Sequence, residues 1–395
     1  MEKVKLGDVC KVQGGYAFKS KEFQKDSIPI IRIGNIQDNE VEIDYNVCFT
    51  KEFLNKHPEF EIKYGYILIA MSGATVGKIG KYQNDTKALL NQRVGNFIVT
   101  EKLEKRYLYF LLQSPLFEKF ILNNAFGCAQ PNISSKQIEE FEFYNYDNVE
   151  QIEIANQLDK VQEIIDFRKK QIQELDELIK SQFVEMFGDP ILNPMNWKVK
   201  KLRDISNKIM SGNTPKGGDR VYVPSGIEFY RSQNVWKNRI EKEDIAYIDE
   251  ETHKNMIKSS LKHNDLLITK TGRINTENSS LGRTAIYTGK DDKANINGHV
   301  YLVRLNEGEN HEFVLRILIS DRYREYIRSV CVGGIDKRQL NKEHIEDFPI
   351  IYPPKELQKE FTDKVRQIDQ QRFEIEKSLE EIQKLQESLM NKYFG

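Results

Sequence analysis

The chain has 395 residues, of which 39% are hydrophobic and 30% charged, enough apolar material for the cores of two or three domains. Its formal net charge of −1 argues against a protein that coats itself in nucleic acid, although a local basic surface is still allowed. No apolar run is long enough to span a membrane and the N-terminus shows no apolar signal segment, so we expect a cytoplasmic protein.

The first part of the chain predicts short strands followed by a helix. Runs rich in Ile, Val, Phe and Tyr at 28–33, 66–71 and 94–99 are typical of strands. A helix is predicted over 106–124. A loop rich in Gly, Gln, Pro and Asn and a closing strand at 141–146 come after it. This succession predicts a globular α+β domain over residues 1–148.

Two long helices are predicted at 149–188 and 356–395, because neither segment contains Gly or Pro before its end. Apolar residues recur in both at alternating spacings of four and three, the heptad pattern of a coiled-coil pair. The predicted seam consists of Leu158, Val161, Ile165, Ile172, Leu175, Ile179, Val365, Ile368, Ile375, Leu379, Ile382 and Leu389. We expect the two helices to run antiparallel. The alternative is that each is an ordinary amphipathic helix lying on its own domain.

The second half of the sequence repeats the first. Gly188 aligns with Gly395, and the same offset of 207 residues holds back to Gly127 and Gly334. A second α+β domain is therefore predicted over residues 189–355. The strand-like segments and the helices agree between the halves, whereas the loops differ, which suggests two similar tasks on two different targets.

Several motifs occur twice in the same order. They are Arg32-x-x-Asn35 with Arg231-x-x-Asn234, and ILIAMSGATVGK with LLITKTGRINTENSSLGRT; a glycine loop leading to NISSKQIEEFEF and the helix EQIEIANQLDKV complete the set. Together they resemble the specificity subunit of type I restriction–modification systems over essentially the whole chain.

The resemblance implies the following. Each domain is a target recognition domain that reads one half of a split sequence in double-stranded DNA. The helices are spacers that set the gap and dock two methyltransferase subunits, which bind S-adenosylmethionine and methylate adenine. Two restriction subunits carry ATP- and Mg²⁺-dependent translocation and cleavage. The specificity subunit itself is non-catalytic and binds no cofactor.

The rest of the sequence agrees with a non-catalytic chain. It has no Walker A motif, no HExxH and no aromatic Pro-Pro methyltransferase motif. The cysteines Cys10, Cys48, Cys128 and Cys331 form no CxxC pair, which predicts reduced, partly buried thiols rather than a metal or disulfide site.

Candidate DNA contacts in the first domain are residues with amide, hydroxyl or cationic side chains, which suit phosphates and base edges. Ser72, Thr75 and Lys78 surround two glycines in a loop that could approach a phosphate or be a plain turn. The other candidates are Asn91, Gln92, Arg93, Gln130, Asn132, Arg32 and Asn35. Because Arg32 recurs as Arg231, it suits a phosphate contact or a structural role better than base choice.

The second domain offers a longer, more basic loop. Its candidates are Lys270, Thr271, Arg273, Asn275, Asn278 and Arg283, with Asn297, His299, Lys337, Arg338, Arg231 and Asn234 elsewhere. A solvated flexible loop is the alternative. For the whole chain, the alternatives are a stand-alone two-headed DNA-binding protein, an enzyme, and a coiled-coil scaffold. Missing catalytic motifs disfavour the enzyme, and selectively varied loops disfavour the scaffold.

Overall fold

The protein, as a computed structural model, is described over residues 2–37, 39–125, 130–276 and 278–395. It forms two compact units. Unit 1 extends to Lys170 and resumes at Ile375, whereas unit 2 is the continuous segment Gln171–Glu374. Each unit therefore contains one half of each long helix.

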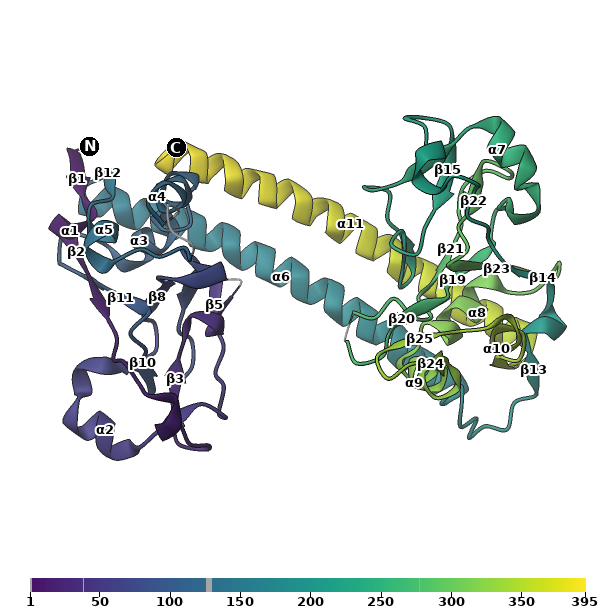
Figure 1. Cartoon of the computed structure of the whole chain (residues 1–395), viewed down its shortest axis with the longest axis horizontal. Coiled ribbons are helices and arrows are strands. Elements are labelled where there is room, and N and C mark those ends of the chain that lie inside the picture. Colours follow the sequence, from purple (N-terminus) through teal and green to yellow (C-terminus); the bar gives the residue numbers. More distant parts are fainter. Residues whose placement is uncertain (1, 38, 126–129, 277) are drawn as a thin grey trace. The chain divides into compact units, whose positions relative to one another are not determined.

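Both long helices are present and unbroken (Figure 1). Helix α6 spans Asn148–Phe187 and α11 spans Lys355–Phe394, each within one residue of the predicted start and end. The division into two recognition domains and two spacers stays a prediction, because the compact units divide the chain in the middle of each helix.

Unit 1 is built on a six-stranded sheet of order β2-β11-β8-β9-β5-β4 and a four-stranded sheet of order β6-β3-β10-β7. Strands β3 and β10 are parallel, and β1 pairs antiparallel with β12. The strands are β1 (Glu2–Lys5), β2 (Cys10–Gly14), β3 (Ile28–Ile31), β4 (Ile36–Gln37), β5 (Asn39–Val41), β6 (Cys48–Phe49), β7 (Glu61–Ile62), β8 (Ile67–Ala70), β9 (Ile79–Lys81), β10 (Ala88–Leu90), β11 (Val94–Val99) and β12 (Glu142–Asn145). The short helices are α1 (Leu6–Val9), α2 (Lys51–Lys56), α3 (Lys105–Leu111), α4 (Pro115–Ala125) and α5 (Ser135–Glu139).

Unit 2 repeats this topology. Its sheet β14-β23-β19-β21 corresponds to β2-β11-β8-β9, its sheet β18-β15-β22 contains the same parallel pair, and β13 pairs with β26. The strands are β13 (Val199–Lys201), β14 (Ser206–Ser211), β15 (Ile227–Tyr230), β16 (Val235–Trp236), β17 (Arg239–Ile240), β18 (Ala246–Ile248), β19 (Leu266–Thr269), β20 (Thr271–Arg273), β21 (Thr284–Ile286), β22 (Ala294–Ile296), β23 (Val300–Leu305), β24 (Val332–Gly333), β25 (Lys337–Gln339) and β26 (Pro349–Ile351). The short helices are α7 (Glu250–Asn255), α8 (His311–Leu318), α9 (Asp321–Val330) and α10 (Lys342–Glu346). The predicted internal repeat is confirmed at the level of the sheets.

The helix predicted over 106–124 is in fact two helices, α3 and α4. Pro115 has no N–H to continue the first helix. The Ser114 hydroxyl instead accepts the N–H of Phe117 at 3.3 Å, which caps the second helix at its start. The apolar periodicity alone did not reveal this break.

In each unit the two helix segments run antiparallel. In unit 1, the Tyr393 hydroxyl donates to Gln157 at 2.8 Å and the Gln386 amide donates to Gln162 at 2.8 Å. In unit 2, the Phe183 and Phe361 rings lie 5.5 Å apart, edge to face. The predicted seam residues are all buried or partly buried. Near the helix ends they join the domain cores rather than only the opposite helix.

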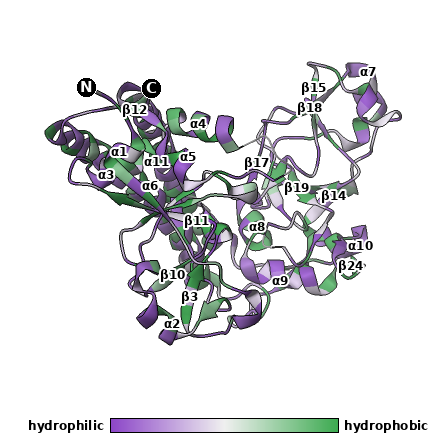
Figure 2. Cartoon of the chain, turned by 60° about the vertical axis from the view of Figure 1, so that its left-hand side comes forward, coloured by the Kyte–Doolittle hydropathy of each residue, from purple (hydrophilic) through white to green (hydrophobic). Residues whose placement is uncertain are grey.

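The cores lie where the strands are apolar, and Figure 2 shows green, hydrophobic ribbon over β3 and β10. Cys10, Cys48 and Cys331 are free and buried, as the sequence predicts, and burial raises the pKa of the Cys10 thiol to about 12. Cys128 lies outside the described residues. Within the described ranges, no helix combines the length and apolarity needed to cross a bilayer.

Candidate nucleic-acid interface

In unit 2, a small three-stranded sheet gathers two distant parts of the predicted site. Strand β20 pairs with β25, and β25 pairs with β24, all antiparallel. Arg273 lies opposite Lys337, and Gly272 lies opposite Arg338. We call these strands, with the turn 334–336, the unit 2 ribbon.

The ribbon continues into the turn before β23, which carries His299. The backbone N–H of Lys270 donates to the carbonyl of His299 at 2.8 Å, and the N–H of Leu340 donates to the carbonyl of Lys270 at 2.9 Å. Six predicted residues therefore lie on one edge of the unit: Lys270, Thr271, Arg273, His299, Lys337 and Arg338.

This edge carries mostly positive charge. Arg273 Nε lies 3.3 Å from Asp336 Oδ2, and both side chains are largely exposed. Arg338 donates to the carbonyl of Cys331 at 3.4 Å, and Lys337 is exposed. Among the described residues, this edge thus carries four cationic side chains, those of Lys270, Arg273, Lys337 and Arg338, and one carboxylate, a balance that suits a phosphate backbone.

The turn of the ribbon depends on glycine. Gly333 has a φ of 135°, and a Cβ there would lie 2.8 Å from the carbonyl oxygen of Lys337. The next N–H, of Gly334, donates to the same oxygen at 3.1 Å. A larger residue at 333 could not make this close backbone approach.

Unit 1 has the same backbone arrangement with other side chains. The N–H of Met71 donates to the carbonyl of Arg93, and the N–H of Ile133 donates to the carbonyl of Met71, both at 2.9 Å. Ser72 pairs with Asn132 in an isolated bridge. Gln92, Arg93, Gln130 and Asn132 are exposed, whereas the Ser72 hydroxyl is buried and has no hydrogen-bond partner among the described residues. Gly127, which the repeat aligns with Gly334, lies outside the described residues.

The shared asparagines Asn35 and Asn234 shape a turn. The Asn35 side-chain oxygen accepts the N–H of Arg32 at 2.9 Å, and the Asn234 oxygen accepts the N–H of Arg231 at 2.9 Å. The Asn234 amide also donates to the carbonyls of Glu241 and Asp244. With 9% and 1% exposure, these side chains face into the protein, so the geometry favours a structural role for both.

The shared arginines are tied to this turn. Arg32 lies 3.7 Å from Asp44, and Arg231 lies 3.0 Å from Asp244. The Gln233 amide and then the Arg231 guanidinium hold the pKa of Asp244 below its usual value. Of the two alternatives for Arg32 and Arg231, the structure favours the structural one. Sequence reasoning missed the matching aspartates, although the repeat offered them as a signal.

Two other predicted residues, Arg283 and Thr75, also make internal contacts. The Arg283 guanidinium lies 3.8 Å from the centre of the Trp236 ring and donates to the carbonyls of Ser279 and Asn278. Burial lowers its pKa. The Thr75 hydroxyl donates to the carbonyl of Ile33 at 3.2 Å.

The remaining predicted residues lie in three different places. The side-chain oxygen of Asn91 accepts the N–H of Arg93, and that of Asn297 accepts the N–H of His299. The two asparagines therefore shape matching turns, one in each unit, at the edge that carries the candidate DNA contacts. Lys78 is exposed but lines a different cleft, together with Phe117 and Ile121. Asn275 and Asn278 are exposed on the long loop that follows β20.

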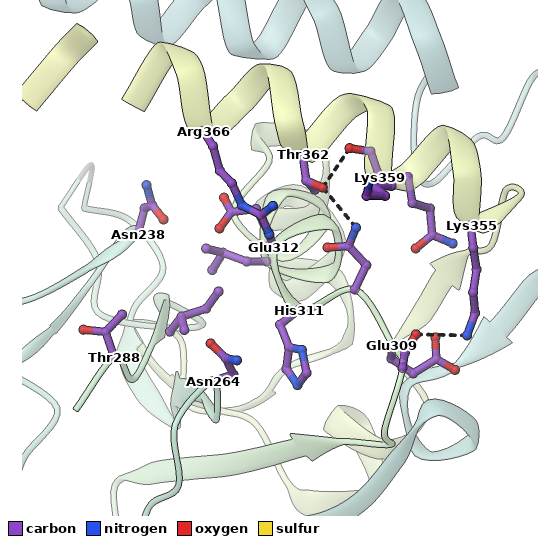
Figure 3. Close-up of a pocket in the computed structure, with 15 residues that line it drawn as sticks. Asn238, Asn264, Thr288, Glu309, His311, Glu312, Lys355, Lys359, Thr362 and Arg366 are labelled. Carbon is purple, nitrogen blue, oxygen red and sulfur yellow. Dashed lines mark hydrogen bonds between the residues drawn. The ribbon is translucent and has the colours of Figure 1, made fainter. Parts of the chain in front are cut away.

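A polar cleft of unit 2 is separate from the ribbon. It measures about 600 Å³, and Figure 3 shows Lys355 and Arg366 reaching into it from α11, with the His311 ring between Asn264 and Glu309. Burial lowers the pKa of His311. No predicted DNA contact lines this cleft. Across the described ranges, no group of three or more His, Cys, Asp or Glu side chains could hold a metal ion.

The two units share one topology, and each carries one edge with exposed basic or polar side chains. This combination is typical of a protein with two similar recognition modules. Residues 1–177 and 194–387 match the family described as type I restriction modification DNA specificity domain. The chain therefore belongs to this family, which is a DNA-recognition family and not a catalytic one.

Named relatives agree with this assignment. The chain is 29% identical over 184 residues to the type I restriction enzyme MjaVIII specificity subunit of Methanocaldococcus jannaschii, covering 45% of this chain and 43% of that protein. It is 23% identical over 425 residues to the EcoBI specificity subunit of Escherichia coli, covering 99% and 85%.

Among solved structures, the fold resembles that of the type I restriction–modification S subunit from M. genitalium. The TM-score is 0.59 at 16% identity, covering 100% of this chain and 96% of that one. A chain from a study of type I R-M complex assembly and conformational transition gives a TM-score of 0.53 at 15% identity, covering 100% and 97%. These likenesses show the fold.

Proposed function

We propose that this chain is the DNA-reading subunit of a type I restriction–modification complex, with each unit reading one half of a two-part DNA sequence. A two-stranded β-ribbon fits the major groove of B-DNA, where each base pair presents its own pattern of donors, acceptors and methyl groups. In unit 2, exposed Arg273 and Lys337 lie opposite each other on paired strands of such a ribbon, whereas in unit 1 exposed Gln92 and Arg93 lie in the turn before β11.

One observation carries the proposal. The backbone ladder that joins Arg93, Met71 and Ile133 recurs as the ladder that joins His299, Lys270 and Leu340, with different exposed side chains around it. A repeated frame with changed side chains is what two readers of different half-sites require. We propose that α6 and α11 set the spacing between the half-sites and dock two methyltransferase subunits, with two restriction subunits joining them.

The cofactors belong to these partners in our proposal. S-adenosylmethionine is expected on the methyltransferase subunits, and ATP and Mg²⁺ on the restriction subunits. Because the net charge of this chain is only −1, phosphate contacts alone give it little attraction to DNA. We expect the chain alone to bind DNA weakly and the assembled complex to bind tightly. Equal affinities of the two would contradict this.

The test is a methylome. The chain is expressed with its methyltransferase subunit in a host free of DNA methylation, and modified bases are then sequenced. Adenine methylation at one split motif, on opposite strands of its halves, is the expected result. Methylation at one continuous short site would mean that only one unit reads DNA. No methylation from an assembled complex would favour a stand-alone two-headed DNA-binding protein.

A further inference from the structure

The tip of the unit 2 ribbon presents an aliphatic side chain to solvent. Ile335 is 89% exposed, more than any other large hydrophobic residue of the described chain. It lies between Gly334 and Asp336, in the turn that joins β24 to β25. Val332, on the first strand of the same hairpin, is also 40% exposed.

Folding does not explain this residue. Single exposed aliphatic side chains are ordinary on protein surfaces, but tight hairpin turns favour Gly, Asn and Asp, and a β-branched residue is a poor choice there. With 89% of its surface in water, Ile335 contributes almost no burial of its own.

The backbone around Ile335 is nevertheless held in place. The carbonyl of Asp336 accepts the N–H of Ile274 at 3.0 Å, and the Asp336 carboxylate lies 3.3 Å from Arg273. These contacts fix one side of the tip to β20. The backbone that carries Ile335 is therefore held in place, and a cation lies on each neighbouring strand, Arg273 on β20 and Lys337 on β25.

An aliphatic group among phosphate-binding cations has one matching partner on the major-groove side of a duplex. The C5 methyl of thymine is the apolar group displayed there, and aliphatic contact with it distinguishes thymine from cytosine. A minor-groove wedge fits less well, because the Asp336 carboxylate beside Ile335 would enter the groove of the more negative potential.

Resting on the proposed function, we propose that Ile335 reads a thymine methyl group in the half-site of unit 2. This assigns a base type to one position of that half-site. It also separates Ile335 from the surrounding Lys and Arg residues, which hold the phosphates.

The experiment removes the methyl group from the DNA and the side chain from the protein. The full chain, assembled with its methyltransferase subunit, is titrated with DNA duplexes that contain the split motif identified by the methylome. Each thymine is replaced in turn by deoxyuridine, which lacks only the C5 methyl. For the wild type we expect one position, in one half-site, at which the replacement weakens binding about fourfold, the factor expected for burying one methyl group.

Ile335→Ala should bind the thymine and deoxyuridine duplexes equally at that position. The matched control is Ile257→Ala, which removes the same atoms from another exposed site of unit 2, at 51% exposure, and should keep the wild-type profile. Both variants should melt at the wild-type temperature, because neither side chain is buried.

Two results would overturn the inference while leaving the proposed function intact. One is a deoxyuridine profile of Ile335→Ala that matches the wild type. The other is an equal weakening of all duplexes by Ile335→Ala, which would indicate a wedge or a general contact. Absence of any sequence-specific binding by the wild-type assembly would overturn the proposed function and this inference together.

Discussion

In unit 1, Ser72 meets Asn132 in a single bridge, whereas in unit 2 the equivalent Thr271 opens a three-stranded ribbon. The two edges share their backbone ladder but differ in charge. Unit 1 has Gln130 where unit 2 has Lys337. The backbone frame of the edge is therefore shared by the two units, whereas the exposed side chains that it carries differ.

The shared frame depends on residues that contact no DNA in our proposal. A glycine with positive φ lies beside an isoleucine in each unit: Gly77 beside Ile121 of α4 in unit 1, and Gly282 beside Ile327 of α9 in unit 2. The buried Asn35 and Asn234 close matching turns. If this separation holds, substitutions in the frame change stability and substitutions on the edge change DNA binding.

The largest effect is expected from the paired glycines. In Gly77→Ala the new Cβ would lie 2.6 Å from Ile121 Cγ2, near the backbone, whereas in Gly282→Ala it would lie 2.7 Å from Ile327 Cδ1, which can move. An alanine with positive φ adds a further cost in both variants. We therefore expect the free energy of unfolding to fall by about 4 kcal/mol in Gly77→Ala and by about 2 kcal/mol in Gly282→Ala. Denaturant unfolding measures both, and hydrogen exchange assigns each loss to its unit. Equal losses would contradict the argument from side-chain mobility.

The buried asparagines should also differ between the units. Asn234→Ala removes the hydrogen-bond partner of the N–H of Arg231 and of the carbonyl of Glu241, whereas the carbonyl of Asp244 keeps its hydrogen bond from the Arg231 guanidinium. Asn35→Ala leaves one group without its partner, the N–H of Arg32. We expect losses of about 2 kcal/mol for Asn234→Ala and about 1 kcal/mol for Asn35→Ala, because each abandoned buried group costs on the order of 1 kcal/mol or more. Thermal melting compares the two variants. A wild-type melting temperature for Asn234→Ala, together with reduced DNA binding, would instead support a contact with DNA.

An exchange of charge between the edges tests the DNA-binding half of the comparison. Lys337→Gln should reduce affinity about tenfold at moderate salt and reduce the slope of log K against log salt by about 0.9, as the loss of one phosphate contact predicts. Gln130→Lys, the reverse change in unit 1, should raise the slope by a similar amount. Salt-titrated binding of the assembled complex measures both. Unchanged slopes would mean that these positions face away from phosphates.

The smallest effect concerns pH. The position after the N-cap holds Lys105 in α3 and His311 in α8, and burial lowers the pKa of both. Since the folded pKa of His311 lies below its usual 6.5, folding disfavours its protonation. Its contribution to stability is present above pH 6.5 and is lost as the pH falls below that value. Nearby Asp265 and Glu309 reduce this shift.

We therefore expect His311→Gln to weaken the pH dependence of unit 2 between pH 7.5 and 5.5 by less than about 1 kcal/mol. Hydrogen exchange at several pH values measures it, and unit 1 is the internal control because a lysine does not titrate there. A pH dependence of unit 2 that is unaffected by the substitution would assign it to the carboxylates instead.

Much of the architecture could be predicted from local patterns. Alternation and composition located strands such as Ile67–Ala70, and the heptad spacing located both long helices, because these signals lie within a few neighbouring residues. The break before Pro115 was missed because the apolar pattern runs through it.

The site was harder to predict than the fold. Residue type selected the segments around Thr271 and Lys337 as candidates, but only the strand pairing shows that they are neighbours. Residue type cannot distinguish a cation that is exposed to solvent from one that makes contacts inside the protein. Arg283, stacked on Trp236, and Asn234, buried in its turn, have the side chains of DNA contacts but are occupied by their own unit.

The distribution of each helix between the units has a consequence for synthesis of the protein. Unit 2 is one continuous stretch of chain, whereas unit 1 requires α11 residues such as Leu389 and Phe394 for its core. During translation, all residues of unit 2 are therefore available once Glu374 has been added. Unit 1 begins first along the chain, but its fold is complete only after residues 375–395 have been added. The usual order of folding from the N-terminus is reversed. Until α11 emerges, Ile154 and Leu158 lack the α11 side chains, such as Phe394, that share their core in the complete fold.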